Sequence, residues 1–558
     1  MKYLITSALP YINSIKHLGN LVGSMLPADV YSRFLRQNGK EVLYICGTDD
    51  HGTPAEISAK QANMTTADFC DIQFEKQKII YENFGISFDF FGRTSREQTK
   101  QITQEIGKQL YKNGFFEIRT IKQIYSIEDG RFLSDRYITG TCPHCGYEMA
   151  RGDQCENCTK LLDPTDLINP RSSISGSTKL EIRESKHLFL LQSNLKDSLR
   201  EWIDGNNAWS QLVKSIAYKW LDEGLEDRCM TRDLDWGTPV VDIEGLENKV
   251  YYVWFDAPIG YIGITKEWAD ANNTDWKSWW YDTKNVYLTQ FMAKDNIPFH
   301  AISFPATLIA ANDNIKLVDD IKGFNWLTYY GGKFSTSQQR GIFTDTALDL
   351  LPADYWRYYL MFRIPEGSDS SFTWQDLQVL INKDLIGVLG NFVSRVLKFT
   401  EKEFSNIVPS CSKISQKENT LIANLGDAIK TYNLNMEIKE FRKAMSSLRF
   451  IWVLGNEYIA SSEPWKVIKE DRLYAETIMN ISINLIRIFA TVSKPIIPFS
   501  AKKILDMLNI SDFSGWIDCN NILSEISFIK EGHILNQNYI LFKRIEDEEI
   551  SDFIQRFG

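Results

Sequence analysis

Two short segments hold residues whose types and spacing suit nucleotide chemistry. His17–Asn20 (HLGN) stands where a strand-like run passes into a helical one, so the free N–H groups and the helix dipole would attract an anion. Gly331–Ser337 (GGKFSTS) joins two glycines to a cation and three hydroxyls. Such a loop can close over a triphosphate, with Lys333 offsetting the charge of leaving pyrophosphate. Each segment alone is a weak signal, because a histidine there is more often a cap and a loop lysine is usually only solvated.

Four of the nine cysteines are crowded into one short stretch. They form two CxxC pairs with nine residues between them, namely Cys142, Cys145, Cys155 and Cys158. Each CxxC turn presents two sulfurs to one ion, so this spacing predicts a closed, tetrahedral and structural zinc site. The other five cysteines are scattered, which favours isolated thiols in a reducing compartment over a disulfide framework.

A carboxylate and an aromatic segment follow two further apolar runs. Asp49 comes after EVLYIC (41–46) and suits an ammonium group, although an Asx turn or helix cap is a common role for such a residue. The run 251–255 (YYVWF) is expected to be a strand that leads into 256–261 (DAPIGY). Its aromatic residues, taken alone, favour core over pocket.

The elements that must position these residues follow from hydrophobic periodicity. Strand-like YLITSAL, a helical stretch at 18–35 and EVLYIC predict a βαβ unit with a parallel sheet. Helices are expected at 67–83 and 97–113, and VYLTQF (286–291) resumes the sheet. The strand ends are therefore candidate site positions.

Two other regions differ from this α/β pattern. From about 116 to 227 the chain is rich in turns and contains the cysteine cluster, so we interpret it as an insertion. Beyond 373 the apolar residues recur at helical spacing, which predicts a helical bundle.

The composition limits the class of protein. With 558 residues, 44% hydrophobic and 24% charged, the chain is expected to fold into several domains. A net charge of −10 gives no overall attraction to nucleic acid, so RNA binding would need local basic and aromatic patches. The N-terminus lacks the features of a signal peptide and no uninterrupted apolar run is long enough to span a membrane. We therefore expect a cytoplasmic protein with no membrane partner.

Five separated motifs resemble those of methionyl-tRNA synthetases in order and spacing. They are SALPYINSIKHLGN, ICGTDDHGTP, YVWFDAPIGY, AKDNIPFH and GGKFSTS, and the similarity runs from Lys2 into the helical C-terminal region. The resemblance implies an α/β protein with a class I Rossmann-like parallel-sheet catalytic domain, a zinc-knuckle insertion and an all-α helical-bundle anticodon-binding domain. The HIGH and KMSKS signatures of that class align with 17–20 and 333–337.

The resemblance also implies the site residues. The catalytic set would be His17, Asn20, Asp49 and Lys333, with Asp49 holding the ammonium group of methionine. The methionine side chain would lie among Leu9, Tyr11, Trp254, Ala257, Pro258, Tyr261 and His300, with Arg232 near the amino-acid end. ATP would be bound by His17, Gly19, Asn20, Lys294, Asp295, Lys333, Ser335, Thr336 and Ser337. The anticodon would be read by Asn391, Arg395 and Trp465.

The same resemblance implies a division of the chain and a set of partners. Residues 1–115 and 231–322 would be the two halves of the catalytic domain, 116–230 the insertion, 323–375 the KMSKS-loop and stem-contact region, and 376–558 the anticodon-binding domain. One structural Zn²⁺ is expected, together with Mg²⁺ bound to ATP. The other partners would be L-methionine and tRNA(Met). The sequence ends soon after the helical region, so we expect no appended module and a monomer.

The sequence departs from the class signatures at two positions. Asn20 replaces the second histidine of HIGH with a neutral amide, and Thr336 replaces the second lysine of KMSKS, removing one positive charge. A similar asparagine and threonine occur in eukaryote-like and archaeal-type members of the family, respectively. We take Arg340 as a candidate substitute for the lost cation.

The expected reaction is methionine activation by ATP, followed by transfer to the 3′ end of the tRNA. Two alternatives remain. Another class I synthetase, for an aliphatic amino acid or cysteine, would share the nucleotide motifs. The insertion leaves no room for a large editing domain, and the aromatic pair of Trp254 and Tyr261 opposes the aliphatic substrates. A noncatalytic, zinc-containing RNA-binding protein is supported only by the charge lost at Thr336.

Overall fold

The computed structural model describes residues 1–133, 137–152, 155, 157–158, 160, 162–334, 340–412, 414–511, 515–536 and 540–557. The chain forms two compact units. Unit 1 consists of Met1–Ile15, Leu43–Ile79 and Phe88–Gly323, and unit 2 consists of Lys16–Val42, Ile80–Ser87 and Phe324–Gly558. Neither unit is one continuous segment of the sequence.

A five-stranded sheet forms the centre of the core of unit 1. Its order is β14 (Asp320–Phe324), β13 (Val286–Ala293), β1 (Lys2–Ser7), β2 (Glu41–Thr48) and β3 (Phe90–Arg93). Strand β1 pairs in parallel with β13, and β2 pairs in parallel with β3. Leu4, Ile45 and Leu288 are fully buried, as expected for apolar strands covered on both faces. The predicted parallel sheet is confirmed.

Helices α5 (Glu97–Lys112), α8 (Val253–Asn272) and α10 (Phe304–Ala311) share this core. Ile106 of α5 and Ile259 of α8 belong to one buried cluster with residues of β1 and β13. The other helices that lie wholly or mainly in unit 1 are α3 (Thr53–Gln61), α4 (Thr66–Asn83), α6 (Lys196–Gly205), α7 (Gln211–Glu223) and α9 (Lys277–Trp280). Helices α4 and α5 confirm the two helices predicted early in the chain.

The strand predicted at 251–255 is wrong over most of its length. Strand β12 covers only Val250–Tyr251, and α8 begins at Val253. The run YYVWF is apolar throughout, so it has no hydrophobic periodicity that would distinguish a buried strand from the start of a buried helix. Pro258 lies inside α8, at its sixth residue, where the missing N–H removes one helical hydrogen bond.

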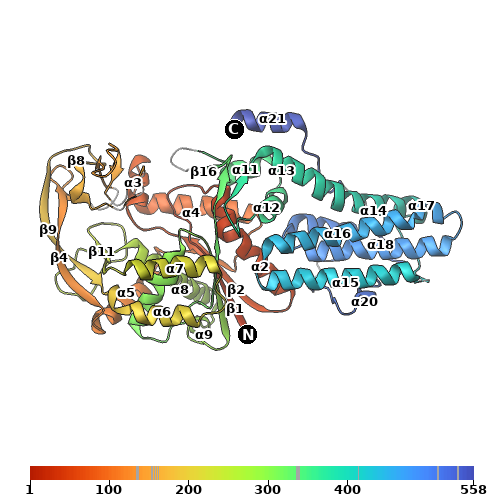
Figure 1. The fold of residues 1–558 in the computed structure, drawn as a ribbon, viewed down its shortest axis with the longest axis horizontal. Coiled ribbons are helices and arrows are strands. Elements are labelled where there is room, and N and C mark those ends of the chain that lie inside the picture. The colour runs from red at the N-terminus through yellow and green to blue at the C-terminus, as the bar shows by residue number, and fades with distance from the viewer. Residues whose placement is uncertain are drawn as a thin grey trace. The chain divides into compact units, whose positions relative to one another are not determined.

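The insertion has its own sheets and core. Strands β4 (Phe116–Ser126) and β9 (Leu180–Leu190) pair antiparallel over their full length and form a long ribbon (Figure 1). Strands β5 (Arg131–Phe132) and β10 (Arg228–Cys229) extend it, and β6 (Ile138–Thr141), β7 (Ala150–Arg151) and β8 (Ile168–Ser172) form a second sheet. Its buried cluster includes Ile138, Cys142 and Cys155.

Unit 2 begins with a continuous helical run after His17. It consists of α1 (Leu18–Asn20), the π-helical segment η1 (Leu21–Met25) and α2 (Leu26–Gln37), which confirms the helix predicted there. The same unit contains the small sheet of β16 (Gly332–Lys333), β15 (Leu327–Tyr329) and β17 (Ser370–Phe372), together with α11 (Thr344–Leu350) and α12 (Ala353–Phe362).

A helical bundle forms the rest of unit 2, as predicted. Its elements are α13 (Trp374–Leu380), π-helical η6 (Ile381–Gly390), α14 (Asn391–Phe404), α15 (Gln416–Glu437), α16 (Phe441–Ser462), α17 (Pro464–Val467), α18 (Arg472–Ser493), α19 (Pro498–Met507) and α20 (Ile522–Glu525). Helix α21 (Asp547–Phe557) packs against α13 and Tyr329 of β15. Helices α14, α15, α16 and α18 run side by side (Figure 1).

Helix α18 is the most apolar long helix of the bundle. Within the described part of the chain, it alone is long and apolar enough to cross a membrane, and 94% of its apolar window is buried by the fold. Length and composition are weak evidence for a membrane span when neighbouring helices cover the surface. Helix α18 is therefore a core helix of the bundle.

A buried arginine ties several elements of unit 2 together. The Arg357 guanidinium, on α12, is fully buried and donates to the Asp29 carboxylate of α2 at 2.7 Å. It also donates to the carbonyl oxygens of Phe84, Gly85, Pro495 and Ile496 at 2.8–3.2 Å. Complete pairing is what allows a charge to be buried. Arg357 therefore fixes α2 against α12 and the α18–α19 junction.

Candidate active site and metal centre

His17 caps the helical run that begins unit 2. Its Nδ1 accepts from the Asn20 backbone N–H at 3.3 Å, and the Asn20 Oδ1 accepts from the His17 N–H at 3.3 Å. Burial, and then the charge of Lys16, lower the pKa of His17 to about 4. The ring is therefore neutral near pH 7, with Nε2 carrying the proton. Asn20, in place of the second HIGH histidine, completes a reciprocal cap.

The glycine pair before Lys333 is part of a hairpin turn. Tyr330 and Gly331 both have positive φ, +48° and +76°, as a two-residue turn between paired strands requires. Lys333 is exposed at the end of β16, and its Nζ lies 4.6 Å from the centre of the Trp326 ring. The turn thus presents a cation on a short, ordered strand.

The two nucleotide segments meet within unit 2. The His17 ring stacks on Phe334, next to Lys333, with centroids 4.8 Å apart and planes 24° apart. His17 also forms an antiparallel bridge with Phe343, and Leu18 donates to the carbonyl of Ile342 at 3.0 Å. The residues on both sides of the KMSKS-type loop therefore contact the start of the helix.

Part of the loop lies outside the described residues, including the predicted ATP ligands Ser335, Thr336 and Ser337. Arg340 follows this gap. Its Nη2 donates to the Tyr329 carbonyl at 3.3 Å, and its guanidinium occupies the space that a Cβ would take at Gly332. Arg340 therefore brings a second cation beside the strand that carries Lys333.

An aromatic cluster surrounds the predicted methionine site in unit 1. Asp49, only 5% exposed, forms a parallel bridge with Tyr11 just beyond the ends of β1 and β2. The Tyr11 ring meets Trp254 edge to face at 6.2 Å, and Trp254 stacks on Phe299 at 3.7 Å. The cluster thus links Asp49 to the first turn of α8.

A buried hydrogen-bonded pair forms another part of this site. The Tyr261 hydroxyl donates to His300 Nε2 at 2.9 Å, and His300 Nδ1 donates to the Asn296 carbonyl at 2.9 Å. Burial lowers the pKa of His300 to about 4, whereas burial raises the pKa of Tyr261. Both side chains are therefore neutral at physiological pH, which suits an uncharged thioether.

The other predicted pocket residues lie on the same elements. Ala257 and Pro258 are buried on α8, and a Cβ at Gly260 would lie 3.5 Å from Leu9 Cδ1. Lys294 and Asp295 directly follow the carboxyl end of β13. Arg232 lies on β11 (Thr231–Arg232), with its guanidinium 3.8 Å from the centre of the Tyr252 ring.

Two residues that the sequence reasoning did not single out connect the parts of this site. His51 Nδ1 lies 2.5 Å from the Asp256 carboxylate, and the Thr238 hydroxyl donates to the same oxygen at 3.1 Å. The loop that carries Asp49 is thereby fixed to α8 beside Trp254. Both His51 and Asp256 stand inside recognised motifs, yet only the fold shows that they meet.

The four clustered cysteines converge as the spacing predicts. Their Sγ atoms all lie within 4.8 Å of one another, with Cys142 and Cys158 at 3.8 Å and Cys145 and Cys155 at 3.6 Å. Zn–S bonds of ~2.3 Å in a tetrahedron require S···S separations of about 3.8 Å. The donor set therefore fits a structural metal ion.

A groove in the helical bundle contains two of the predicted anticodon residues. Arg395, Trp465, Lys398, Phe399, Lys402, Ile459 and Pro464 line a cavity of about 310 Å³. The Arg395 guanidinium lies 5.9 Å from the centre of the Trp465 ring, and Trp465 is 37% exposed. Asn391 begins α14, one turn before Arg395. Cations and an open aromatic face suit an unstacked base.

Comparison with known proteins agrees with these features. Residues 3–397 match the family model of tRNA synthetases class I (M), and residues 408–558 match that of the anticodon binding domain of methionyl tRNA ligase. The methionine–tRNA ligase of Streptomyces avermitilis is 53% identical over 100% of this chain and 99% of its own length. Methionine–tRNA ligase 1 of Acaryochloris marina is 52% identical over the whole of both chains.

A solved structure shares the fold. The methionyl-tRNA synthetase of Mycobacterium tuberculosis, in complex with methionyl-adenylate, superposes with a TM-score of 0.77 at 24% identity, covering 98% of this chain and 100% of that one. The chain belongs to the class I tRNA synthetase (M) family.

Proposed function

We propose that the chain is a methionine–tRNA ligase. It activates L-methionine with ATP, releases pyrophosphate, and transfers methionine from methionyl-adenylate to the 3′ end of tRNA(Met). The observation that carries the substrate assignment is the neutral Tyr261–His300 pair beside the stacked Trp254 ring, with Asp49 at the strand ends. A thioether gains from sulfur–aromatic contact, and the carboxylate suits an ammonium group.

In the activation step, the methionine carboxylate is itself the nucleophile and attacks the α-phosphate in line. No side-chain base is needed, so the protein contributes alignment and charge stabilisation. The Nε2–H of neutral His17 donates to a phosphate oxygen, and Gly19 lets that phosphate approach the backbone closely at the helix start. Mg²⁺ enters with ATP and offsets phosphate charge.

Lys333 stabilises the pyrophosphate as it leaves, and Arg340 supplies the cation that Thr336 lacks. The position of Arg340 against Gly332 supports this role. Lys294 and Asp295, at the end of β13, bind the ribose side of ATP, and the loop hydroxyls of Ser335 and Ser337 bind phosphate. If Arg340→Ala leaves the activation rate unchanged, the assignment of Arg340 is wrong.

Transfer begins when the 2′ or 3′ hydroxyl of the terminal adenosine attacks the adenylate. Arg395 and Trp465 bind the anticodon of the tRNA in the bundle groove, and Asn391, one turn before Arg395 on α14, also reads the anticodon. The four-cysteine cluster would hold one Zn²⁺, which would stabilise the insertion. The enzyme works in the cytoplasm as a monomer.

The domains that perform these steps are 1–115 and 231–322 for catalysis, 116–230 for the insertion, 323–375 for the KMSKS loop and 376–558 for the anticodon. The two compact units support a division near residue 323. The division also assigns Lys16–Val42 to unit 2, because the helix after His17 contacts the later segment.

Amino-acid-dependent exchange of pyrophosphate into ATP tests the function directly. The purified chain should exchange with methionine at least a hundred-fold faster than with isoleucine, valine or cysteine. Exchange with another amino acid would identify a different class I synthetase. No exchange with any of them, combined with retained tRNA binding, would favour the noncatalytic RNA-binding alternative.

A further inference from the structure

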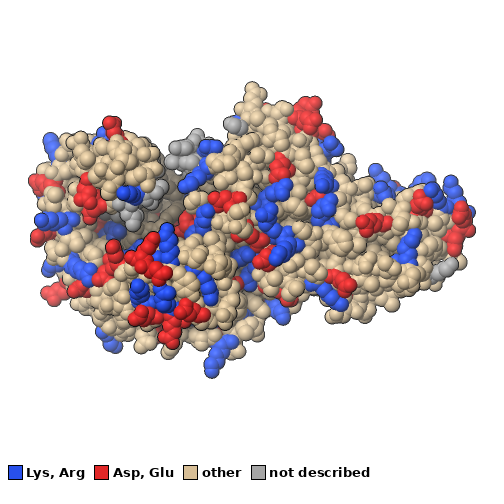
Figure 2. Space-filling model, in the orientation of Figure 1, with Lys and Arg blue, Asp and Glu red and all other residues tan. Residues whose placement is uncertain are grey.

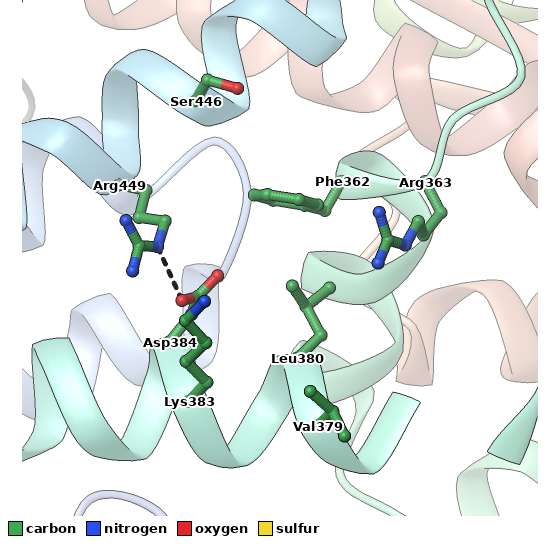
Figure 3. Close-up of a pocket in the computed structure, with 8 residues that line it drawn as sticks. All are labelled: Phe362, Arg363, Val379, Leu380, Lys383, Asp384, Ser446 and Arg449. Atoms are coloured by element: carbon green, nitrogen blue, oxygen red, sulfur yellow. Dashed lines mark hydrogen bonds and ion pairs between the residues drawn. The ribbon is translucent and has the colours of Figure 1, made fainter. Parts of the chain in front are cut away.

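A second cavity in unit 2 lies outside the residues assigned above. It measures about 370 Å³ and is lined by Phe362, Arg363, Val379, Leu380, Lys383, Asp384, Ser446 and Arg449. Figure 3 shows these side chains converging from α12, α13, η6 and α16, with Ser446 and Arg449 on the wall opposite Val379 and Leu380. Four elements therefore contribute to one depression.

The charge of this cavity is positive. Its lining has three cations, Arg363, Lys383 and Arg449, and one carboxylate, Asp384. That carboxylate is already used, because Arg449 Nε donates to one oxygen at 2.7 Å and the Tyr358 hydroxyl donates to the other at 3.1 Å. Figure 2 shows Lys and Arg side chains gathered over α12 and α16.

Within the described part of the chain, the cations retain unused donors. Arg363 gives Nε and Nη2 to the Asp376 carboxylate at 2.8 and 2.6 Å, and Arg449 gives only Nε to Asp384. Lys383 is exposed and has no ion-pair partner among the described residues. Buried Asp384 and its partners hold Arg449 in place, so the geometry is ordered before any ligand arrives. Because Arg363 and Arg449 are each paired with a carboxylate, Lys383 leaves these groups with one net positive charge that an anion can offset.

The nature of the anion follows from the position of the cavity along the bundle. Lys383 and Arg395 lie on one uninterrupted helical run, η6 followed by α14, twelve residues apart. This separation is at most about 18 Å at 1.5 Å per residue. We propose that the cavity binds a backbone phosphate of the tRNA whose anticodon occupies the groove of Arg395 and Trp465. The proposal rests on the proposed function and extends it to a second contact on the same RNA.

The test compares tRNA affinity among charge variants at the cavity. Lys383→Glu and Ser446→Asp place a carboxylate on opposite walls, and each is expected to weaken binding of a tRNA(Met) transcript about ten-fold. Loss of one phosphate contact should also reduce the slope of log Kd against log salt by roughly 0.7–0.9. Lys383→Arg, which keeps the positive charge, should show the wild-type tRNA affinity and the wild-type salt slope. The matched control is Lys530→Glu, a charge reversal at an exposed lysine outside these elements.

Each outcome decides the proposal. Wild-type affinity in Lys383→Glu, or an equal loss in Lys530→Glu, would overturn it. Binding of free phosphate alone would also overturn it. In that case inorganic phosphate would raise the melting temperature of the wild type but not of Lys383→Glu, and the tRNA affinity of Lys383→Glu would be unchanged. Methionine-dependent exchange in the same variants should stay at the wild-type rate. Methionine-dependent exchange needs no tRNA, so a wild type without exchange activity would reject the proposed function. The phosphate site would then be judged separately, by the tRNA-binding measurements.

Discussion

At the residue scale, the site uses histidines that stay neutral. His17 has one ring nitrogen engaged by the Asn20 N–H, whereas His300 has both engaged, by the Asn296 carbonyl and the Tyr261 hydroxyl. A neutral ring can donate to a phosphate or face a thioether without bringing a charge into a half-buried site. The two residues thus have different roles in the same protonation state.

Replacement of His17 by alanine should slow adenylate formation by about 10²–10³-fold, as for loss of a preorganised donor to a transition-state oxygen. The Michaelis constant for methionine should change less than three-fold, because the methionine pocket lies on other elements. Exchange kinetics at varied methionine give both quantities. Equal effects on rate and methionine affinity would contradict the assigned role.

The low pKa of His300 links stability to pH. The pKa is about 4 in the fold against 6.5 for the free side chain, so the unfolded chain binds the proton first as pH falls. The contribution of neutral His300 to the free energy of unfolding is fully present above pH 6.5. It is lost as the pH falls toward 4, which lowers the free energy of unfolding by about 3 kcal/mol in total. Urea unfolding of wild type and His300→Gln should show a shallower acid decline in the variant. Parallel declines would refute this link.

At the element scale, the sequence predicted the parallel sheet, the early helices and the bundle, because their apolar periods are long and clear. It failed at YYVWF, where α8 begins at Val253. It also could not show that His51 meets Asp256, since a contact between residues so far apart depends on the fold. The His17–Phe334 stack was likewise outside its reach, although both residues stand in recognised motifs.

The four-cysteine cluster should need all of its thiolates to hold a metal ion. Cys145→Ser should lower bound zinc from about one per chain to below a tenth, because a four-thiolate site loses closure with one ligand. Metal analysis after gel filtration measures this. Cys411→Ser, at an exposed cysteine outside the cluster, should retain the full metal content. Full zinc in Cys145→Ser would show that the ligand set is misassigned.

At the scale of the whole molecule, activation and tRNA selection depend on different regions. Trp465→Ala should lower kcat/KM for tRNA about 10–100-fold, the range for loss of one base–aromatic stack. Methionine-dependent exchange should be unchanged, because it needs no tRNA. Leu434→Ala, at an exposed apolar residue on α15, serves as the control for truncation in the bundle. A matching fall in the exchange rate would mean that Trp465 stabilises the fold and does not bind the anticodon.

The burial of α18 has a consequence for how the chain is made. This helix is apolar enough to suit a lipid interior, yet α14 and α16, which cover it, precede it in the sequence. During synthesis from the N-terminus, α14 and α16 therefore leave the ribosome before α18, so their apolar faces are available to pack against it. A circular permutant that starts at Arg472 would release the segment before those helices exist, and should depend far more strongly on chaperones.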